Sequence, residues 1–479
     1  MYVYLKSILL FGIVACGFTH ASQTKIPVQD LKSDFEALYQ NLKEAHFDLY
    51  VNITKADLDR EYKIRMNKIT KPMTPIQAQI YFQKFVALIK IAHTKIDLPN
   101  QAFADFMEGG GAVFPLDIRV KEKKFFIIAN DSGIKDIQAG DQLISINGET
   151  MEQWSRRLAA YISADTDTML HGFFEFWFPF LVWLEMGEQS HFKVTVTRAA
   201  ANPQTYEIPA RDRSFMQDQS KMRKGRLSLD GGRSFRIMDG IGYLRPGPFY
   251  NIDGEDIWDV KPFQKFIDNA YSKMIDQSVK ALIIDIRDNP GGTNSFSDHM
   301  LAWFADKPFR FASRFDVKVS KQTIKANAKR LKPNDTESIS AQYAKEFATR
   351  KPGDIFPFHI EEATPRKGQR FQKPVYLLVN RHSYSNAVLV ATMVQDYGFG
   401  TVIGEETNDL ATTYGAMEHF NLPKTQIQVG YPKAFIIRPN GDATIRGVVP
   451  DIIIETPLIE TEDDPVLKET LKVLKERLK

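Results

Sequence analysis

The sequence has almost no cysteine: Cys16 is the only one among 479 residues. A single thiol excludes an internal disulfide bond, so the folded chain must obtain its stability from packing in any compartment. Charge of one sign is not in excess either, since 62 Lys and Arg stand against 59 Asp and Glu, with a formal net charge of +3. This balance, without a concentrated basic tract, gives no reason to expect nucleic-acid binding.

Motifs for metals and phosphates are also absent from the sequence. The nine histidines show no ligand spacing of the His-x-x-x-His or His-Glu-x-x-His kind. No glycine-rich phosphate loop is present. We therefore expect no metal ion and no other cofactor.

After the N-terminal segment, no apolar run is long enough for a membrane-spanning helix, which needs roughly 20 residues. Residues 7–15 (SILLFGIVA) form a shorter uncharged run that follows Lys6. A short basic start, an apolar run and then small residues are typical of a secretory signal. We therefore expect an exported protein, either in the bacterial periplasm or anchored to a membrane and facing the periplasm.

Two processing sites fit this segment. Residues 19–21 (THA) resemble a cleavage site, which would make residues 1–21 a signal peptide. Residues 13–16 (IVAC) resemble a bacterial lipoprotein box, which would make residues 1–15 the signal and attach the protein to a membrane through a lipid on Cys16. In a third interpretation, Cys16 is only an apolar residue within the signal.

Periodicity predicts an α/β multidomain protein. Near the start, Leu31, Phe35, Leu38 and Leu42 recur at helical spacing and line one face. Later, apolar strands alternate with helical segments, which indicates a layer of largely parallel strands. The predicted parts are a signal segment, a helical N-terminal domain over 24–103, a β-rich domain over 104–212, a linker over 213–233, an α/β domain over 234–457 and a C-terminal helix over 458–479.

Two segments of the β-rich part carry further predictions. Residues 139–148 (AGDQLISING) read as a Gly-Asp turn, a strand and an Asn-Gly turn. This pattern resembles a PDZ domain, in which the strand after such a glycine holds the terminus of a peptide. Residues 173–183 are rich in Phe and Trp, and they either form core between domains or make a hydrophobic wall that contacts substrate.

The first chemical motif is residues 281–292 (ALIIDIRDNPGG), a buried strand that runs into a tight Gly-Gly turn. Glycines there allow close approach of a ligand and can point N–H groups outward, as in an oxyanion hole. A purely structural turn is the alternative.

The second motif is residues 375–386 (VYLLVNRHSYSN), a strand followed by a short polar turn and a helix. A serine at this turn can expose its hydroxyl near the N–H groups that begin the helix. Alternatively, Ser385 only caps the helix, because serine is a favoured N-cap residue.

In this order the two motifs resemble the C-terminal-processing (tail-specific) serine peptidase family. The resemblance extends over about residues 30–457, and it implies a crotonase-like α/β catalytic domain that hydrolyses exported polypeptides through an acyl-enzyme. The matching positions are Arg287-Asp288-Asn289-Pro290-Gly291-Gly292, then Ser385, Asp396, residues 404–407 (GEET) and residues 447–451 (GVVPD).

The resemblance also assigns the nucleophile and its oxyanion hole. In the family the nucleophile lies eleven residues before the Asp that ends the helix, which selects Ser385 and leaves Ser383 as the weaker candidate. By the same match, the oxyanion hole combines the N–H of Asn386 with that of Gly291 or Gly292.

The general base follows from the branch of the family. One branch uses a lysine at the position that Leu410 occupies, so a Ser-Lys dyad is not expected. The other branch resembles the tricorn core and uses a histidine in the N-terminal domain. Here His93 matches, in the segment Ile91-Ala92-His93-Thr94, although the Gly-Asp-Gly that usually precedes it is missing. His382, next to the nucleophile turn, is the rival base.

The acid member of the site departs from the family pattern. The expected Glu position holds Thr444. If this segment is a strand, Asp442 points to the same face and can orient His93. Other acids nearby in the sequence are Glu405, Asp409 and Glu418. With the lysine and the glutamate both missing, the alternative function is a catalytically weak or inactive homologue that binds a peptide or an apolar ligand.

Overall fold

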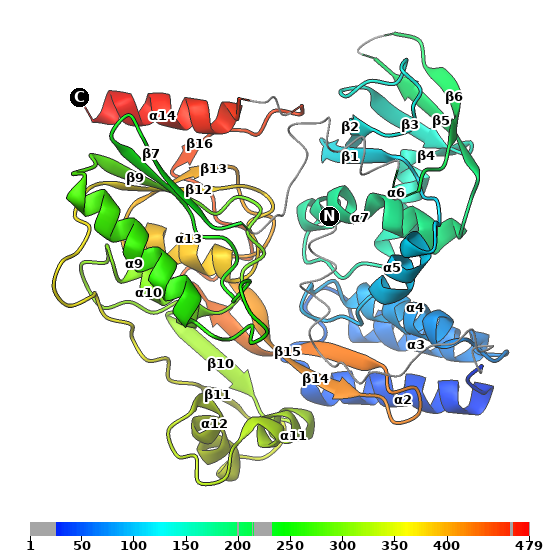
Figure 1. Ribbon diagram of the computed structural model, residues 1–479. Coiled ribbons are helices and arrows are strands. Elements are labelled where there is room, and N and C mark those ends of the chain that lie inside the picture. The colour runs from blue at the N-terminus through cyan, green and yellow to red at the C-terminus, as the bar shows by residue number, and fades with distance from the viewer. Residues whose placement is uncertain (1–24, 199–200, 213, 215–231, 460–462, 479) are drawn as a thin grey trace.

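The computed structural model describes residues 25–198, 201–212, 214, 232–459 and 463–478 (Figure 1). The predicted signal segment, including Cys16, and most of the predicted linker lie outside the described residues. Within the described part of the chain, no helix combines the length and the apolar character needed to cross a bilayer.

The N-terminal part is helical because its apolar residues recur every three or four positions. Leu31, Phe35 and Leu38 are fully buried against Phe82 and Phe85 of a later helix. Thr54 and Thr74 cap two of the helices through their side chains. The elements are α2 (Val28–Ala45), α3 (Lys55–Lys68), α4 (Pro75–Val86), the 3-10 helix η1 (Ala87–Ile89) and α5 (Asn100–Glu108).

The next part is a six-stranded antiparallel sheet in the order β1-β2-β3-β5-β6, with β4 paired to β3. The predicted Gly-Asp turn precedes β3, and Asn147 and Gly148 both adopt positive φ in the turn from β3 to β4. The elements are β1 (Leu116–Lys121), β2 (Lys124–Asn130), β3 (Gln142–Ile146), β4 (Glu149–Thr150), α6 (Met151–Ala159), α7 (Asp167–Met186), β5 (His191–Thr197) and β6 (Gln204–Pro209).

The α/β part is built on a second six-stranded sheet in the order β16-β13-β12-β9-β8-β7. All neighbours are parallel except β7 and β8, as the alternation of strands and helices predicts. The elements are β7 (Ser234–Met238), β8 (Ile241–Arg245), α9 (Lys261–Asp276), β9 (Ala281–Asp285), α10 (Asn294–Leu301), β12 (Val375–Val379), α13 (Asn386–Asp396), β13 (Thr401–Gly404), β16 (Ile452–Ile453) and α14 (Pro465–Arg477).

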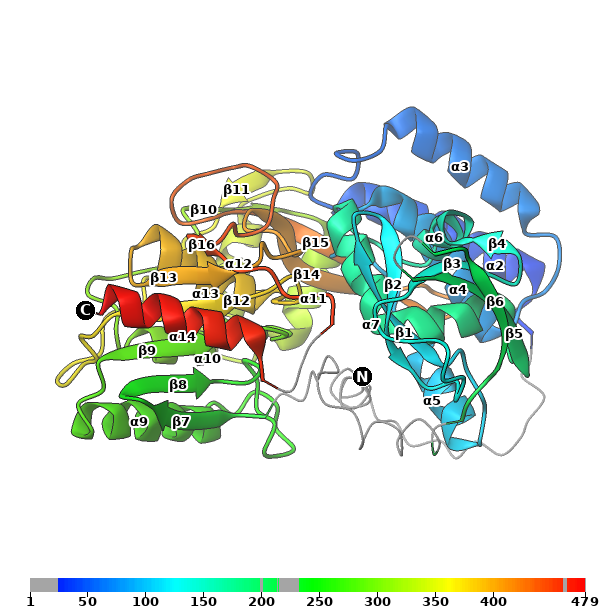
Figure 2. The same cartoon turned by 90° about the horizontal axis from the view of Figure 1, so that it is seen from above.

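Both faces of this sheet are covered, so its central strands β9 and β12 are buried along their whole length and almost entirely apolar. Along β9, Leu282 and Ile284 face the core beneath α9, α10 and α13, whereas Ile283 faces α14. Figures 1 and 2 show α14 on one side of the sheet and α9 and α13 on the other. This packing fixes the carboxyl ends of β9 and β12 side by side, where the two chemical motifs begin.

A third, four-stranded sheet in the order β11-β10-β15-β14 joins the α/β part to the N-terminal helices. Tyr431 and Val429 of its hairpin are buried in the same core as Leu31 and Phe35. In Figure 1 the hairpin lies next to α2, at the lower edge of the helical part. The elements are β10 (Arg314–Lys318), α11 (Lys321–Arg330), α12 (Ile339–Ala348), β11 (Ile355–Pro357), β14 (Thr413–Asn421) and β15 (Gln428–Ile437).

Candidate active site

Ser385 stands at the sharp turn between β12 and α13. Its backbone adopts φ 55° and ψ −122°, in the positive-φ region that residues with a Cβ rarely occupy. The side chain makes no capping hydrogen bond to α13, so the alternative in which its hydroxyl caps the helix does not hold. A strained, half-buried serine between a strand and a helix has the geometry of a nucleophile elbow.

Ser383 is fully buried and fills a different role in the same turn. Its hydroxyl donates to the carbonyl of Ile286 over 2.8 Å and accepts the N–H of Asn380 over 3.1 Å. The hydroxyl therefore connects the end of β12 to the segment after β9. This arrangement removes Ser383 as an accessible nucleophile.

The Gly-Gly turn after β9 packs directly against Ser385. Gly291 has φ +88°, and a Cβ there would lie 2.6 Å from the carbonyl oxygen of Tyr384 and 2.7 Å from the nitrogen of Asn386. Gly292 has φ +139°, and a Cβ would lie 2.1 Å from the carbonyl oxygen of Phe249. No larger residue fits either position without movement of the backbone, which explains the two glycines.

The N–H groups of this turn differ in what they bind. The Gly291 N–H donates to Asn289 Oδ1 over 2.9 Å, so it is already used. Among the described residues, no acceptor lies within hydrogen-bond range of the N–H groups of Gly292 and Asn386. Of the predicted donors, Gly292 and Asn386 are thus the ones left for an oxyanion, whereas Gly291 serves the turn itself.

His93 follows η1 in a segment that is held on both sides. The adjacent Thr94 hydroxyl lies 2.7 Å from His46 Nε2, and Lys95 exchanges backbone hydrogen bonds of 3.1 and 2.8 Å with Gly430 of β15. On the other side, the Ala92 N–H donates to Asp165 Oδ2 over 2.8 Å. Burial raises the pKa of Asp165 to about 7.

Asp409 is a buried carboxylate that binds the Ser385 N–H and interacts electrostatically with His93. Its Oδ2 accepts the Ser385 N–H over 2.5 Å and its Oδ1 accepts the Leu410 N–H over 2.9 Å. Burial raises the pKa of Asp409, and the positive charge of a protonated His93 opposes that rise. Burial likewise lowers the pKa of His93, and the charge of Asp409 opposes that fall. Protonated His93 and ionised Asp409 therefore stabilise each other.

The His93 ring is not hydrogen-bonded to Ser385. Its Nδ1 is shielded from solvent and has no partner of good geometry among the described residues. No hydrogen bond between the ring and Ser385 Oγ is present in this part of the chain. Such bonds are often long before substrate binds and shorten in the complex.

The structure does not bring Asp442, the predicted acid, to His93. β15 ends at Ile437, and the chain then turns through Gly441 at φ +86°. The carboxylate of Asp442 is exposed and accepts the Thr444 N–H over 2.9 Å. Residues 442 and 444 lie outside any strand, so the alternation on which the expectation for Asp442 depended does not apply.

The other acids considered are paired elsewhere. Glu405 accepts a bidentate pair of hydrogen bonds from Arg381, from Nε over 3.1 Å and from Nη2 over 2.9 Å. Glu418 forms ion pairs with Arg330 and Lys433. Asp409 was one of four sequence candidates, and only its burial and its contacts distinguish it.

His382, the rival base, belongs to a buried ion-pair cluster. Its Nε2 lies 2.9 Å from Glu175 Oε2 of α7, and its ring packs edge-on against Phe176 with centroids 4.4 Å apart. Burial alone would raise the pKa of Glu175, but the nearby His382 ring and the charge of Arg381 hold it below its usual value. His382 thus ties the nucleophile turn to α7.

A cavity of about 420 Å³ opens beside Ser385. One face of α7 packs into the core of the antiparallel sheet through Phe174 and Phe178, and the opposite face lines the cavity. The aromatic segment over residues 173–183 therefore contains both core residues and residues that line a cavity. Lining residues include Ser385, Gly292, His382, Phe173, Phe176, Trp177 and Phe180.

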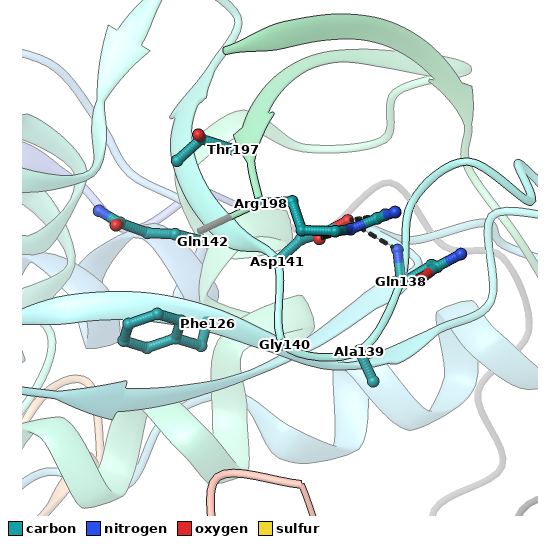
Figure 3. A pocket seen from close by; sticks show the side chains of 8 residues that line it. All are labelled: Phe126, Gln138, Ala139, Gly140, Asp141, Gln142, Thr197 and Arg198. Atoms are coloured by element: carbon teal, nitrogen blue, oxygen red, sulfur yellow. Dashed lines mark hydrogen bonds and ion pairs between the residues drawn. The ribbon is translucent and has the colours of Figure 1, made fainter. Parts of the chain in front are cut away.

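A second hollow, of about 370 Å³, lies over the turn that precedes β3 (Figure 3). Asp141 Oδ1 and Oδ2 there accept from Arg198 over 2.6 and 2.9 Å, and Oδ2 also accepts the Gln138 N–H over 2.8 Å. Burial tends to raise the pKa of Asp141, but the bond from Arg198 holds it below its usual value. This hollow shares no lining residue with the Ser385 cavity.

Comparison with known proteins agrees with this architecture. Residues 240–454 match the model of the family described as peptidase family S41. The solved structure of mature CPAF complexed with lactacystin superposes with a TM-score of 0.65 at 14% identity, covering 94% of this chain and 99% of that one. A structure of mature CPAF gives 0.59 at 14% identity, with 94% and 97% covered. At these identities the likeness concerns the fold.

The matched range begins at β8 and ends at β16, so it contains both chemical motifs and the strands that carry them. Residues 240–454 are thus similar to peptidase family S41, and the chain shares the mixed α/β multidomain fold of CPAF.

Proposed function

We propose that this protein is an exported serine peptidase that hydrolyses peptide bonds of exported polypeptides through an acyl-enzyme on Ser385. The observation that carries the proposal is the backbone of Ser385, strained at φ 55°, with its N–H bonded to Asp409 and its side chain lining a cavity. Export rests on residues 1–21 alone, as does a lipid on Cys16. The proposal includes a PDZ-like domain over residues 104–212 and a crotonase-like catalytic domain over residues 234–457.

The mechanism follows the His-using branch of the family, because position 410 holds a leucine. Ser385 Oγ attacks the carbonyl carbon of the peptide bond while His93 takes the hydroxyl proton. The N–H groups of Gly292 and Asn386 stabilise the oxyanion. His93 then gives its proton to the leaving amine, and an ester to Ser385 remains.

Water completes the cycle. His93 removes a proton from the water as it attacks the ester, and collapse of the second oxyanion releases the carboxylic acid and restores the serine hydroxyl. Asp409 takes the place predicted for Asp442, because it stabilises the protonated His93. It acts through His93 and is therefore a positioning residue.

The hydrolysis experiment uses an unfolded protein as substrate and counts new α-amino groups. We expect the wild type to release them and Ser385→Ala to lower the rate by about 10³-fold or more. Ser338→Ala is the control, since Ser338 caps α12 through its side chain and should leave the rate unchanged. Equal rates for Ser385→Ala and the wild type would refute the proposal.

A second candidate function, binding of an apolar ligand without catalysis, is favoured by the aromatic cavity and by the missing bond between His93 and Ser385. It predicts apolar material that copurifies with the folded protein, and no hydrolysis above the Ser385→Ala background.

A further inference from the structure

The cavity beside Ser385 begins at the reacting groups. Ser385 and Gly292 line it together with the outer face of α7. The aromatic wall of the cavity consists of Phe173, Phe176, Trp177 and Phe180 of α7. The ring centroids of Phe173 and Tyr384 lie 6.1 Å apart, so this wall reaches the residue before the nucleophile. A substrate side chain close to the scissile bond would therefore enter this space.

The wall is preformed. Phe173 stacks on Trp177 with centroids 4.9 Å apart and an interplanar angle of 9°, and Phe180 packs on Phe103 of α5 at 4.7 Å. The reverse face of α7 is locked in the core through Phe174 and Phe178. Little ordering remains to be done when a ligand binds, which favours selective binding.

The charged groups along the cavity already have partners. Lys95 Nζ lies 2.9 Å from Asp97 Oδ1, Arg381 is paired with Glu405 at 2.9 Å, and His382 is paired with Glu175 at 2.9 Å. A charged substrate group would lose its hydration and find no free counter-charge. The cavity therefore suits an uncharged side chain.

We propose that this cavity selects substrates by a large apolar side chain, such as Phe, Trp or Leu, within two residues of the scissile bond. The proposal rests on the proposed function and adds the substrate class. A volume of about 420 Å³ lies within the usual range of small-molecule pockets and greatly exceeds the needs of Ala or Ser. Small or charged side chains leave the aromatic surface in contact with water, so they contribute little binding free energy.

The test digests a randomised peptide mixture with the full-length protein and reads the residues around each cleaved bond by mass spectrometry. We expect one position to be enriched in Phe, Trp or Leu, with kcat/KM about 10- to 100-fold above the Ala peptide. Phe173→Ala should reduce this preference by a similar factor. Phe106→Ala is the matched control, because Phe106 is also half-buried but packs on Trp183 outside the cavity.

A second variant distinguishes a change in specificity from a loss of folding. Trp177→Glu adds a negative charge to the wall and should shift cleavage toward bonds near Lys or Arg. Hydrolysis without an apolar bias in the wild type would overturn this inference alone, as would a Phe173→Ala enzyme that slows equally on every peptide. Absence of hydrolysis and of labelling by a fluorophosphonate would instead refute the proposed function.

Discussion

Replacing Asp409 with Asn is expected to lower kcat by about 10²- to 10⁴-fold, with a much smaller change in KM. The carboxylate stabilises protonated His93 and holds the Ser385 N–H, and a neutral amide of the same size cannot supply the charge. KM should change little because Asp409 does not line the cavity. Steady-state kinetics on one peptide substrate measure both constants.

The matched control for this prediction is Asp442→Asn. That carboxylate is exposed and bonded to Thr444, so the variant should keep its activity. The pH dependence separates the role of Asp409 from a structural one, because loss of the charge should move the acidic limb of the kcat profile to lower pH as His93 becomes a weaker base. Full activity of Asp409→Asn, or an equal loss in Asp442→Asn, would contradict the assignment.

Gly291→Ala should reduce kcat/KM by at least about 100-fold. The new Cβ would lie 2.6 to 2.7 Å from Tyr384 O, Asn386 N and Ser385 Cβ, so the nucleophile turn must move. A shift of about 1 Å in a reacting group can cost this much. Kinetics and thermal unfolding of the purified variant test the prediction together.

Gly353→Ala distinguishes the steric effect from the backbone effect. Gly353 has a similar φ of +98°, but nothing lies within 4 Å of its Cβ position. In this control, the positive φ alone should lower the free energy of unfolding by about 1 kcal/mol. Its kinetics should match those of the wild type. If both alanine variants lose activity equally, close packing at Gly291 is not the cause.

The α/β part and the nucleophile turn could be predicted from the sequence because their patterns are local. Strands such as β9 and β12 are short apolar runs bounded by turn residues, and Ser385 lies between such a strand and a helix. The mixture of buried and cavity-lining aromatic residues on α7 could not be resolved, since a helix that is apolar all round does not reveal which face lies against the core.

The acid was difficult to predict because its position depends on tertiary structure. The expectation for Asp442 required a strand, whereas the chain turns after Ile437. Asp409 had no local pattern of its own, and only the packing of residues 407–411 beneath Ser385 makes it important. The β14–β15 hairpin brings the His93 segment to this site through Lys95 and Gly430, a contact between residues more than 300 positions apart.

The role of Ser385 as nucleophile is tested most directly by the rate at which a fluorophosphonate labels the folded protein, with the modified residue identified by mass spectrometry. We expect a label on Ser385 that is absent in Ser385→Ala and that forms at least about 10²-fold more slowly in His93→Gln. His382→Gln keeps a donor for Glu175 and should change the rate only a few-fold. A label on another serine, or a loss in His382→Gln that His93→Gln does not share, would contradict it.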